Sequence, residues 1–159
     1  MVKKIPITIL GFKKLKYELN DLKNVKRKKI INNIKRAREH GDLKENAEYH
    51  AAREEQSFCE GRIKEIENKL SNLNVIDITK VPNKKKVVFG VTVTILNILS
   101  KKFFTYKIVG EDESNFKNKL ISIKSPISRG LIGKYVGETS SIKTPNGKIK
   151  YKILNVEHI

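Results

Sequence analysis

Two stretches of this chain carry the same apolar spacing: FKKLKYELNDL at residues 12–22 and IKEIENKLSNL at residues 63–73. In each stretch the apolar residues follow one another at steps of three, four and three. They are Phe12, Leu15, Leu19 and Leu22 in the first stretch, and Ile63, Ile66, Leu70 and Leu73 in the second. Steps of three and four place side chains on one face of an α-helix. Each stretch therefore predicts an amphipathic helix with one apolar stripe.

The two stripes match when one helix is folded back on the other. Pairing from the outside inward joins Phe12 to Leu73, Leu15 to Leu70, Leu19 to Ile66 and Leu22 to Ile63, and the two position numbers of every pair have the same sum. Ile34 and Ala51 obey the same rule. A constant sum is the register of two antiparallel helices in one coiled-coil seam. The sequence therefore predicts a helical hairpin that folds back between Asp42 and Leu43, with Asp42 and Glu45 at its tip.

The second half of the chain has a different residue pattern. Beyond the lysines at 84–86, β-branched and aromatic residues dominate segments 87–96, 103–109, 120–123 and 149–156, which predicts strands. A turn signal at 144–147 precedes the last strand. Ser125 and Pro126 are typical of the cap and first position of a short helix, which we expect to run through Leu131 and end at Gly133.

These patterns predict an α+β protein in two parts. The first is a long antiparallel helical hairpin at residues 1–76, and the second is a small, mostly antiparallel β domain with a short helix at residues 77–159. Both parts are large enough for a modest apolar core, because 38% of the residues are hydrophobic.

The chain is strongly basic, with a net charge of +17, and the charge is unevenly distributed. Residues 12–41 contain eleven Lys and Arg against three Asp and Glu, for a net +8, whereas residues 42–75 contain five against eight, for a net −3. Arms of unlike charge attract across the flanks of a hairpin and disfavour pairing of like helices, so we expect a monomer. The surplus on the first arm can meet phosphates, although the abundance of Lys, Ile and Asn also fits AT-rich coding sequence.

No segment predicts a membrane span or a disulfide. The longest apolar stretch, around residues 87–99, is interrupted by small and polar residues, among them Gly90 and Thr92. The N-terminus lacks the cleavage pattern of a signal peptide, so we expect a cytoplasmic protein. The single cysteine, Cys59, lies four residues before Ile63 and is expected to pack in the helical seam.

The tip carries the residues that are best placed for chemistry. Gly41 can end the first helix in a left-handed conformation, and Asp42 is then in position to cap the second. Glu45 lies three residues later, so the two also fit a capping box with a carboxylate in place of the hydroxyl. The alternative is functional, because two exposed carboxylates can supply part of a Mg²⁺ site, together with waters and substrate phosphates. The pair is too small to be a metal site of its own.

Other residues near the tip also have both a structural and a functional interpretation. Arg38 and Arg53 flank the tip and can contact a phosphate backbone, or can form an ordinary solvated helix face. Tyr49 can stack on a base or cover the end of the hairpin. The histidines near the tip and the cysteine fit no zinc spacing.

Two longer motifs resemble a known family. GDLKENAEYHAAREEQSFCEGRI at residues 41–63 and SPISRGLIGK at residues 125–134 closely resemble the bacterial transcript-cleavage factors of the Gre family, and the resemblance extends over essentially the whole chain. It implies an N-terminal antiparallel coiled coil and a C-terminal domain of FKBP-like fold that docks on RNA polymerase at the mouth of its secondary channel. By the same resemblance, the hairpin enters that channel and Asp42 and Glu45 reach the polymerase active centre.

The resemblance also implies how such a factor acts. In a backtracked polymerase the 3′ end of the nascent RNA is extruded past the catalytic site. Asp42 and Glu45 would help hold a second, weakly bound Mg²⁺ and orient a water for attack on an internal phosphodiester, which would rescue the arrested complex. Arg38 and Arg53 match basic positions of the family and would steady the extruded RNA.

A factor of this kind is an activator of the hydrolytic activity of the polymerase and is not itself an enzyme. We expect it to have no cofactor of its own, with Mg²⁺ supplied in the polymerase active centre. Docking on the polymerase would use Ser125, Pro126 and Ile127, of which Pro126 and Ile127 are expected to present an apolar patch.

Two other functions are compatible with parts of the sequence. A basic helical-hairpin module that binds RNA or the ribosome, without a catalytic role, would explain the charge and the seam, but has no use for an acidic pair at the tip. A prolyl isomerase would share the implied FKBP-like fold, yet such enzymes line their pocket with aromatic residues, usually including tryptophan, and this chain has none.

Overall fold

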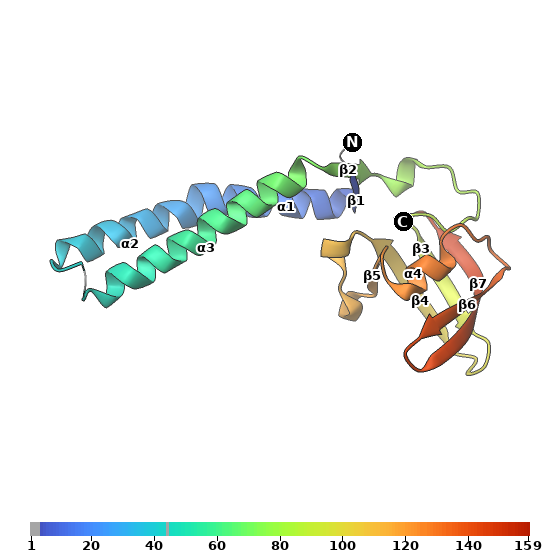
Figure 1. Ribbon diagram of the computed structural model, residues 1–159. Coiled ribbons are helices and arrows are strands. Elements are labelled where there is room, and N and C mark those ends of the chain that lie inside the picture. The colour runs from blue at the N-terminus through green and yellow to red at the C-terminus, as the bar shows by residue number, and fades with distance from the viewer. Residues whose placement is uncertain (1–3, 44) are drawn as a thin grey trace. The chain divides into compact units, whose positions relative to one another are not determined.

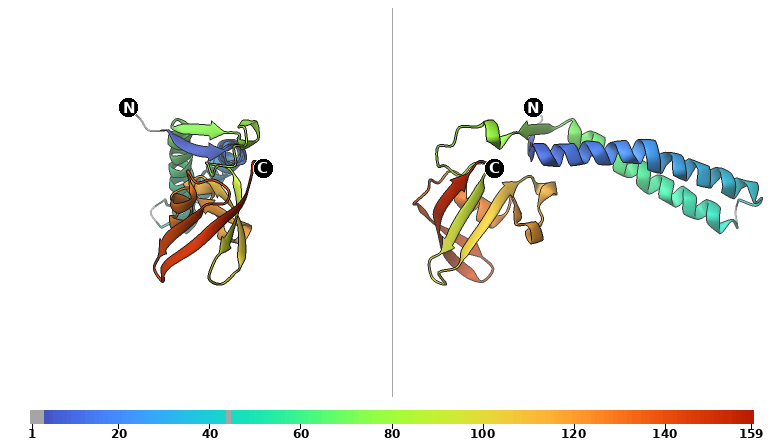
Figure 2. Two further views of the ribbon diagram at one scale, coloured as in Figure 1. Left: turned by 90° about the vertical axis from the view of Figure 1, so that its right-hand side faces the viewer. Right: turned by 180° about the vertical axis from the view of Figure 1, so that it is seen from behind.

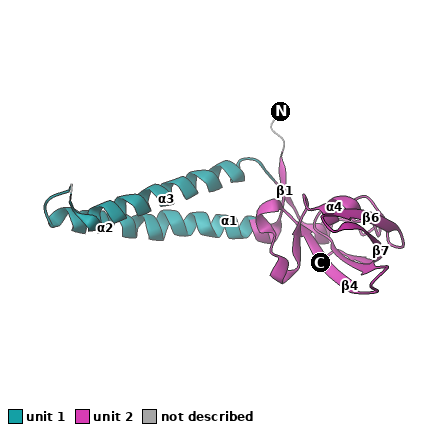
Figure 3. Cartoon of the chain, turned by 60° about the horizontal axis from the view of Figure 1, so that its bottom comes forward, with its two compact units in different colours: residues 1–2, 12–73 teal, residues 3–11, 74–159 magenta. Residues whose placement is uncertain are grey.

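The computed structural model describes residues 4–43 and 45–159. Within them the chain forms two compact units, one a helical hairpin and the other a β domain (Figures 1 and 3). The α+β class expected from the sequence is confirmed.

The first arm of the hairpin is helical from Ile9 to Glu39. It consists of α1 (Ile9–Asp21), a π-helical turn (Leu22–Lys26) and α2 (Arg27–Glu39). The second arm is α3 (Ala47–Leu70). Figure 1 shows α2 running back alongside α3, as the apolar stripes predicted. Leu73, the expected outer partner of Phe12, instead begins strand β2 (Leu73–Ile76).

The seam is confirmed near its base and shifted by one residue near the tip. Leu15, Leu22, Ile63 and Ile66 are buried as expected. The predicted pair of Ile34 with Ala51 is wrong, because Ala51 is exposed and Ala52 is buried. The π turn explains the shift, since it holds one residue more than an α-helical turn. Beyond it, every position of the first arm is displaced by one relative to the second.

Ion pairs join the basic arm to the acidic arm, as the charge distribution predicted. Arg62 Nε lies 2.7 Å from Glu18 Oε1, and Arg27 Nε lies 2.7 Å from Glu60 Oε1. The hydrogen bonds from the Arg62 guanidinium hold the pKa of the Glu18 carboxyl below its usual value. Because these pairs are largely exposed to solvent, each adds little to the stability of the hairpin, and their role is chiefly to select the antiparallel partner.

The N-terminal segment belongs with the β domain, which corrects the expected division at residue 76. Strand β1 (Ile5–Thr8) pairs with β2, and residues 4–11 group with residues 74–159. The carboxylate of Glu113 explains this grouping. It accepts hydrogen bonds from the backbone N–H of Thr8 at 3.1 Å, from the Thr8 hydroxyl and from the backbone N–H of Gly110 at 2.8 Å.

The β domain contains a five-stranded sheet with the order β5-β4-β3-β7-β6. Its strands are β3 (Thr92–Asn97), β4 (Phe103–Val109), β5 (Leu120–Ser122), β6 (Thr139–Thr144) and β7 (Gly147–Glu157). Neighbouring strands are antiparallel except β4 and β5. Figure 2 shows the sheet from two further directions. Short 3₁₀ turns lie at Ile78–Lys80, Glu111–Glu113 and Phe116–Asn118.

Two strand predictions need correction. The strand expected from residue 87 begins only at Thr92, because Gly90 turns the chain with a φ of +91°. Val87 and Val91 are nevertheless fully buried in the core. Strand β6 was not predicted, since within Thr139–Thr144 only Ile142 is a large apolar residue.

The short helix α4 (Pro126–Leu131) forms as expected. The Ser125 side chain accepts a hydrogen bond from the backbone N–H of Ser128 at 3.2 Å, and Pro126 occupies the first helical position. Leu131 is fully buried in the core, and the Gly130 carbonyl accepts a 2.6 Å hydrogen bond from the Ser140 hydroxyl on β6. Gly130 also allows close packing, because an added Cβ would lie 2.7 Å from Ile142 Cγ1.

Candidate functional site at the hairpin tip

The first arm ends in the way that the sequence predicted. The backbone N–H groups of His40 and Gly41 donate to the carbonyls of Ala37 and Arg38 at 3.2 and 3.3 Å. Gly41 has a φ of +101°, in the left-handed region that favours glycine. The chain therefore leaves α2 sharply and enters a short loop.

The second arm is capped by Asn46, which corrects the prediction that Asp42 caps it. Asn46 Oδ1 accepts a hydrogen bond from the Tyr49 backbone N–H at 3.1 Å, which is the geometry of an N-cap. Asn46 Nδ2 donates to the Ala37 carbonyl at 2.7 Å and so joins the two arms. Asn46 is a favoured capping residue directly before the helical pattern, so the sequence does contain a signal for this cap. The position of Asp42 directly after Gly41 favours Asp42 instead.

Replacing Asn46 with Ala is expected to destabilise the hairpin. Loss of the cap costs about 1 kcal/mol, and loss of the hydrogen bond to Ala37 adds about 1 kcal/mol. Urea unfolding of the whole chain, followed by the helical circular dichroism signal, measures this change. Asn32→Ala, at an exposed position in the interior of α2, is the control and should leave the free energy of unfolding unchanged or slightly higher. Equal curves for both variants would contradict the role given to Asn46.

Because Asn46 caps α3, Asp42 and Glu45 do not form the capping box. Both carboxylates lie exposed in the loop between α2 and α3. Carboxylate oxygens suit Mg²⁺, and one or two of them commonly bind it when other ligands complete the shell. Within residues 4–43 and 45–159 no group of three or more His, Cys, Asp or Glu side chains is arranged to hold a metal ion. Two exposed carboxylates in one loop are chemically suited to supply part of the shell of a metal ion that other groups also bind.

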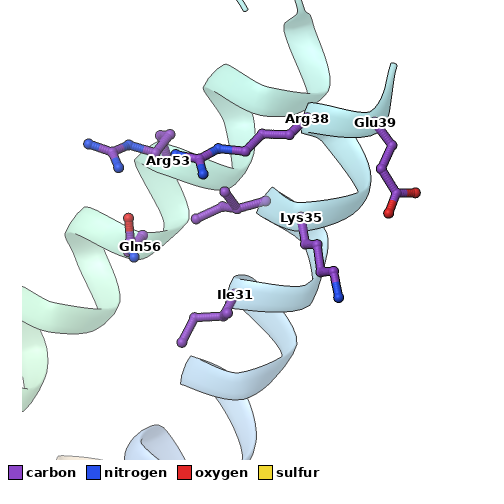
Figure 4. Close-up of a pocket in the computed structure, with 7 residues that line it drawn as sticks. Ile31, Lys35, Arg38, Glu39, Arg53 and Gln56 are labelled. Carbon is purple, nitrogen blue, oxygen red and sulfur yellow. The ribbon is translucent and has the colours of Figure 1, made fainter. Parts of the chain in front are cut away.

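Arg38 and Arg53 line one groove between the two arms. Arg38 comes from the last turn of α2 and Arg53 from the second turn of α3, and Ile31, Ile34 and Gln56 also line the groove. Figure 4 shows the two guanidinium groups extending to the same side of the hairpin, with the Glu39 carboxylate on the other side. Two cations on an apolar floor, close to the carboxylate loop, suit a phosphodiester with an attached base or ribose.

Tyr49 is partly buried at the start of α3. Its backbone N–H serves the Asn46 cap, and its ring lies edge-on to the ring of His50, with centroids 5.7 Å apart. These contacts agree with the structural interpretation of Tyr49, in which it covers the end of the hairpin. Cys59 is buried in the seam as expected, with its Sγ 3.8 Å from the Leu22 carbonyl.

The expected docking residues differ in their exposure. Pro126 is exposed, whereas Ile127 is half-buried and packs against the core of the β domain. Ser125 caps α4. Ile132, which the sequence did not single out, is 37% exposed just beyond α4. The apolar surface at this helix is thus formed by Pro126 and Ile132, and the expected patch of Pro126 with Ile127 is only half exposed.

The sequence matches two family models that together span most of the chain. The model described as "Transcription elongation factor, N-terminal" matches residues 5–75, and "Transcription elongation factor, GreA/GreB, C-term" matches residues 82–158. The chain belongs to the GreA/GreB family of transcription elongation factors. Membership confirms the resemblance carried by residues 41–63 and 125–134. It does not favour the alternatives of a non-catalytic RNA-binding module or a prolyl isomerase.

Relatives in the family share the full length of the chain. A transcription elongation factor GreA of Buchnera aphidicola subsp. Baizongia pistaciae is 66% identical over 154 residues, which cover 97% of each chain. A GreA of Yersinia pestis is 60% identical over 158 residues, covering 99% of this chain and all of the other. These names agree with the motifs, which resemble GreA more than GreB.

Solved structures give more distant similarities. GreA factor homolog 1 of Thermus thermophilus is 22% identical, with a TM-score of 0.44 and coverage of 98% of this chain and 99% of the other. A GreA/GreB factor of Nitrosomonas europaea is 20% identical, with a TM-score of 0.42 and coverage of 97% and 98%. The family assignment rests on the sequence matches. In the described part of the chain, no helix is long and apolar enough to cross a membrane.

Proposed function

We propose that this elongation factor acts on bacterial RNA polymerase in the cytoplasm, as a monomer, and stimulates cleavage of the 3′ end of backtracked nascent RNA. The hairpin enters the secondary channel and brings Asp42 and Glu45 to the polymerase active centre. The polymerase performs the hydrolysis, and the factor supplies ligands. The observation that carries this proposal is the placement of two exposed carboxylates, neither of which caps α3, in the loop at the end of a two-helix hairpin.

The length of the hairpin supports this proposal. The 24 residues of α3 form a rod of about 36 Å at about 1.5 Å per residue. Such a rod can carry a small loop deep into a channel too narrow for a whole domain. The cross-arm ion pairs and the Asn46 link keep the two arms together, so that the loop arrives in a defined position.

At the active centre, the carboxylates of Asp42 and Glu45 would complete the coordination of Mg²⁺ held mainly by the polymerase. The bound metal supplies an activated water and stabilises charge on the phosphodiester. Each carboxylate can also accept a hydrogen bond from the attacking water and so orient it. Two ligands are sufficient for this role, because Mg²⁺ commonly binds one or two protein carboxylates along with substrate phosphates.

Arg38 and Arg53 would hold the extruded RNA next to the carboxylate loop. Both line the groove near the tip, and their guanidinium groups extend to the same side of the hairpin. A guanidinium can form two parallel hydrogen bonds to one phosphate, which fixes the direction as well as the position of the RNA.

The C-terminal domain would dock on the polymerase through the surface at α4. Pro126→Asp should weaken polymerase binding by about tenfold or more, as for a central interface residue, without loss of melting temperature. Asp is tolerated here because a negative charge is favourable in the first turn of a helix. Ile127→Asp should instead lower the melting temperature, because Ile127 packs against the core.

Competition against the unmodified chain for polymerase, together with thermal melting of each variant, distinguishes these effects. Equal polymerase affinity of Pro126→Asp and the unmodified chain would place the docking surface elsewhere. The activity itself is tested by adding the purified chain to a stalled, backtracked elongation complex with labelled RNA. Rapid appearance of a shortened RNA that polymerase then extends is the expected result, and no change in cleavage rate would exclude the proposal.

A further inference from the structure

The sheet of the C-terminal domain buries one face and exposes the other. Ile95, Tyr106 and Ile153 point into the core from β3, β4 and β7 and are at most 7% exposed. Directly opposite residues of an antiparallel pair lie on the same face. The register of the sheet therefore identifies the residues on the opposite, exposed face, called the outer sheet face below.

Lysines dominate one side of the outer sheet face. Lys148, Lys150 and Lys152 occupy alternate positions of β7 and are exposed, about 6.8 Å apart along the strand. Lys143 of β6 lies directly opposite Lys148. Like charges directly opposite each other destabilise a sheet. An arrangement that costs stability in the isolated chain is favourable once a polyanion lies over it.

The exposed hydroxyls of Thr139 and Ser141 on β6 and one aromatic ring complete this face. One row across the sheet runs from Thr139 on β6 through Lys152 on β7 and Leu96 on β3 to Phe103 on β4. Phe103 is 66% exposed, so most of its ring is accessible to a partner. It lies two strands from Lys152, about 10 Å away. Figure 2 shows these central strands side by side.

We propose that the outer sheet face binds single-stranded nucleic acid. The lysines would neutralise phosphates, the hydroxyls would donate hydrogen bonds to phosphate oxygens, and Phe103 would stack on one base. A sheet face that combines exposed aromatic and basic residues is a common platform for single strands.

Other partners fit this face less well. A duplex has its bases already stacked and offers no use for the exposed ring of Phe103. An acidic protein surface would match the lysines alone. Within the strands of this face the carboxylate of Glu157 lies at the far end, and its Oε1 already accepts a 2.9 Å hydrogen bond from Asn155 Nδ2. The lysines are therefore not neutralised by neighbours on their own face.

The test is the affinity of the full chain for a short, fluorescein-labelled oligouridylate, measured by fluorescence anisotropy over a range of salt concentrations. Every variant carries Arg38→Ala and Arg53→Ala, so that the groove near the tip does not contribute. Lys150→Glu with Lys152→Glu should raise the Kd at least about tenfold. The slope of log Kd against log salt concentration should fall by about one to two. Phe103→Ala should raise the Kd by about tenfold, whereas Phe103→Tyr should stay within about twofold.

The control for net charge is Lys84→Glu with Lys117→Glu, which changes two exposed lysines outside the strands of the sheet by the same total charge. Its effect on the Kd should be about twofold or less. Equal losses in the two double variants would show that RNA binds only through the net charge and would overturn the proposal. The proposal would also fail if Lys150→Glu with Lys152→Glu kept its affinity for RNA but lost affinity for polymerase, because the face would then bind protein. Neither outcome depends on whether the tip carboxylates stimulate cleavage.

Discussion

Replacement of Asp42 by Asn, or of Glu45 by Gln, is expected to lower stimulated RNA cleavage by about 10²-fold or more while leaving polymerase binding unchanged. Each change removes the charge of one oxygen ligand and keeps the size of the side chain. Since Asn46 and not Asp42 caps α3, the hairpin should remain folded. Stimulated cleavage in a stalled elongation complex and competition for polymerase measure the two quantities separately.

Glu54→Gln provides the matched control, because Glu54 is an exposed carboxylate on α3 that lies outside the loop. This variant should stimulate RNA cleavage at the rate of the unmodified chain. If both loop variants also retained the rate of the unmodified chain, the carboxylates would have no catalytic role. If they lost helical content instead, the role of the loop in folding would have to be revised.

Shortening the hairpin by one heptad in each arm is expected to abolish stimulation although Asp42 and Glu45 are both present. Deleting residues 15–21 and 64–70 removes matched parts of the seam and leaves the π turn and the loop intact. The reach of the tip falls by about 10 Å. Catalysis that depends on the position of metal ligands tolerates errors of about 1 Å. The shortened chain should therefore bind polymerase but not stimulate RNA cleavage.

The deletion also removes Glu18 and Glu67, which pair with Arg62 and Lys23 across the arms. A full-length chain carrying Glu18→Gln and Glu67→Gln is therefore the control, and it should keep most of its activity. Stimulation by the shortened chain at the rate of this control would mean that the tip does not act at the end of a fixed reach.

The hairpin was predictable because a helical seam is a periodic signal. Leu15, Leu22, Ile63 and Ile66 are buried where the steps of three and four placed them. The register near the tip was not predictable from that signal. The π turn at Leu22–Lys26 buries Leu22 and has no local signature in LKNVK. A uniform helix therefore predicted Ala51 in place of Ala52.

The loop shows a second limit of sequence-based reasoning. Asp42 and Asn46 are both good capping residues, and local propensity alone does not choose between them. The choice depends on the hydrogen bond from Asn46 Nδ2 to Ala37 on the opposite arm, a contact between residues nine positions apart. Strand β6 was missed for a related reason, because its alternating pattern rests on Ser140 and Ile142 and its other residues are polar.

The central claim is that the loop carboxylates bind the Mg²⁺ that the polymerase uses for cleavage, and the Mg²⁺ dependence of stimulated cleavage tests it most directly. The rate in a backtracked complex is measured against Mg²⁺ concentration with the unmodified chain, Asp42→Asn and Glu54→Gln. Loss of a ligand worth about 1.4 kcal/mol should raise the Mg²⁺ midpoint for Asp42→Asn about tenfold, with partial recovery of the rate at high Mg²⁺. Glu54→Gln should follow the unmodified chain. A midpoint that is identical for all three, with Asp42→Asn slow at every concentration, would contradict metal binding by the loop.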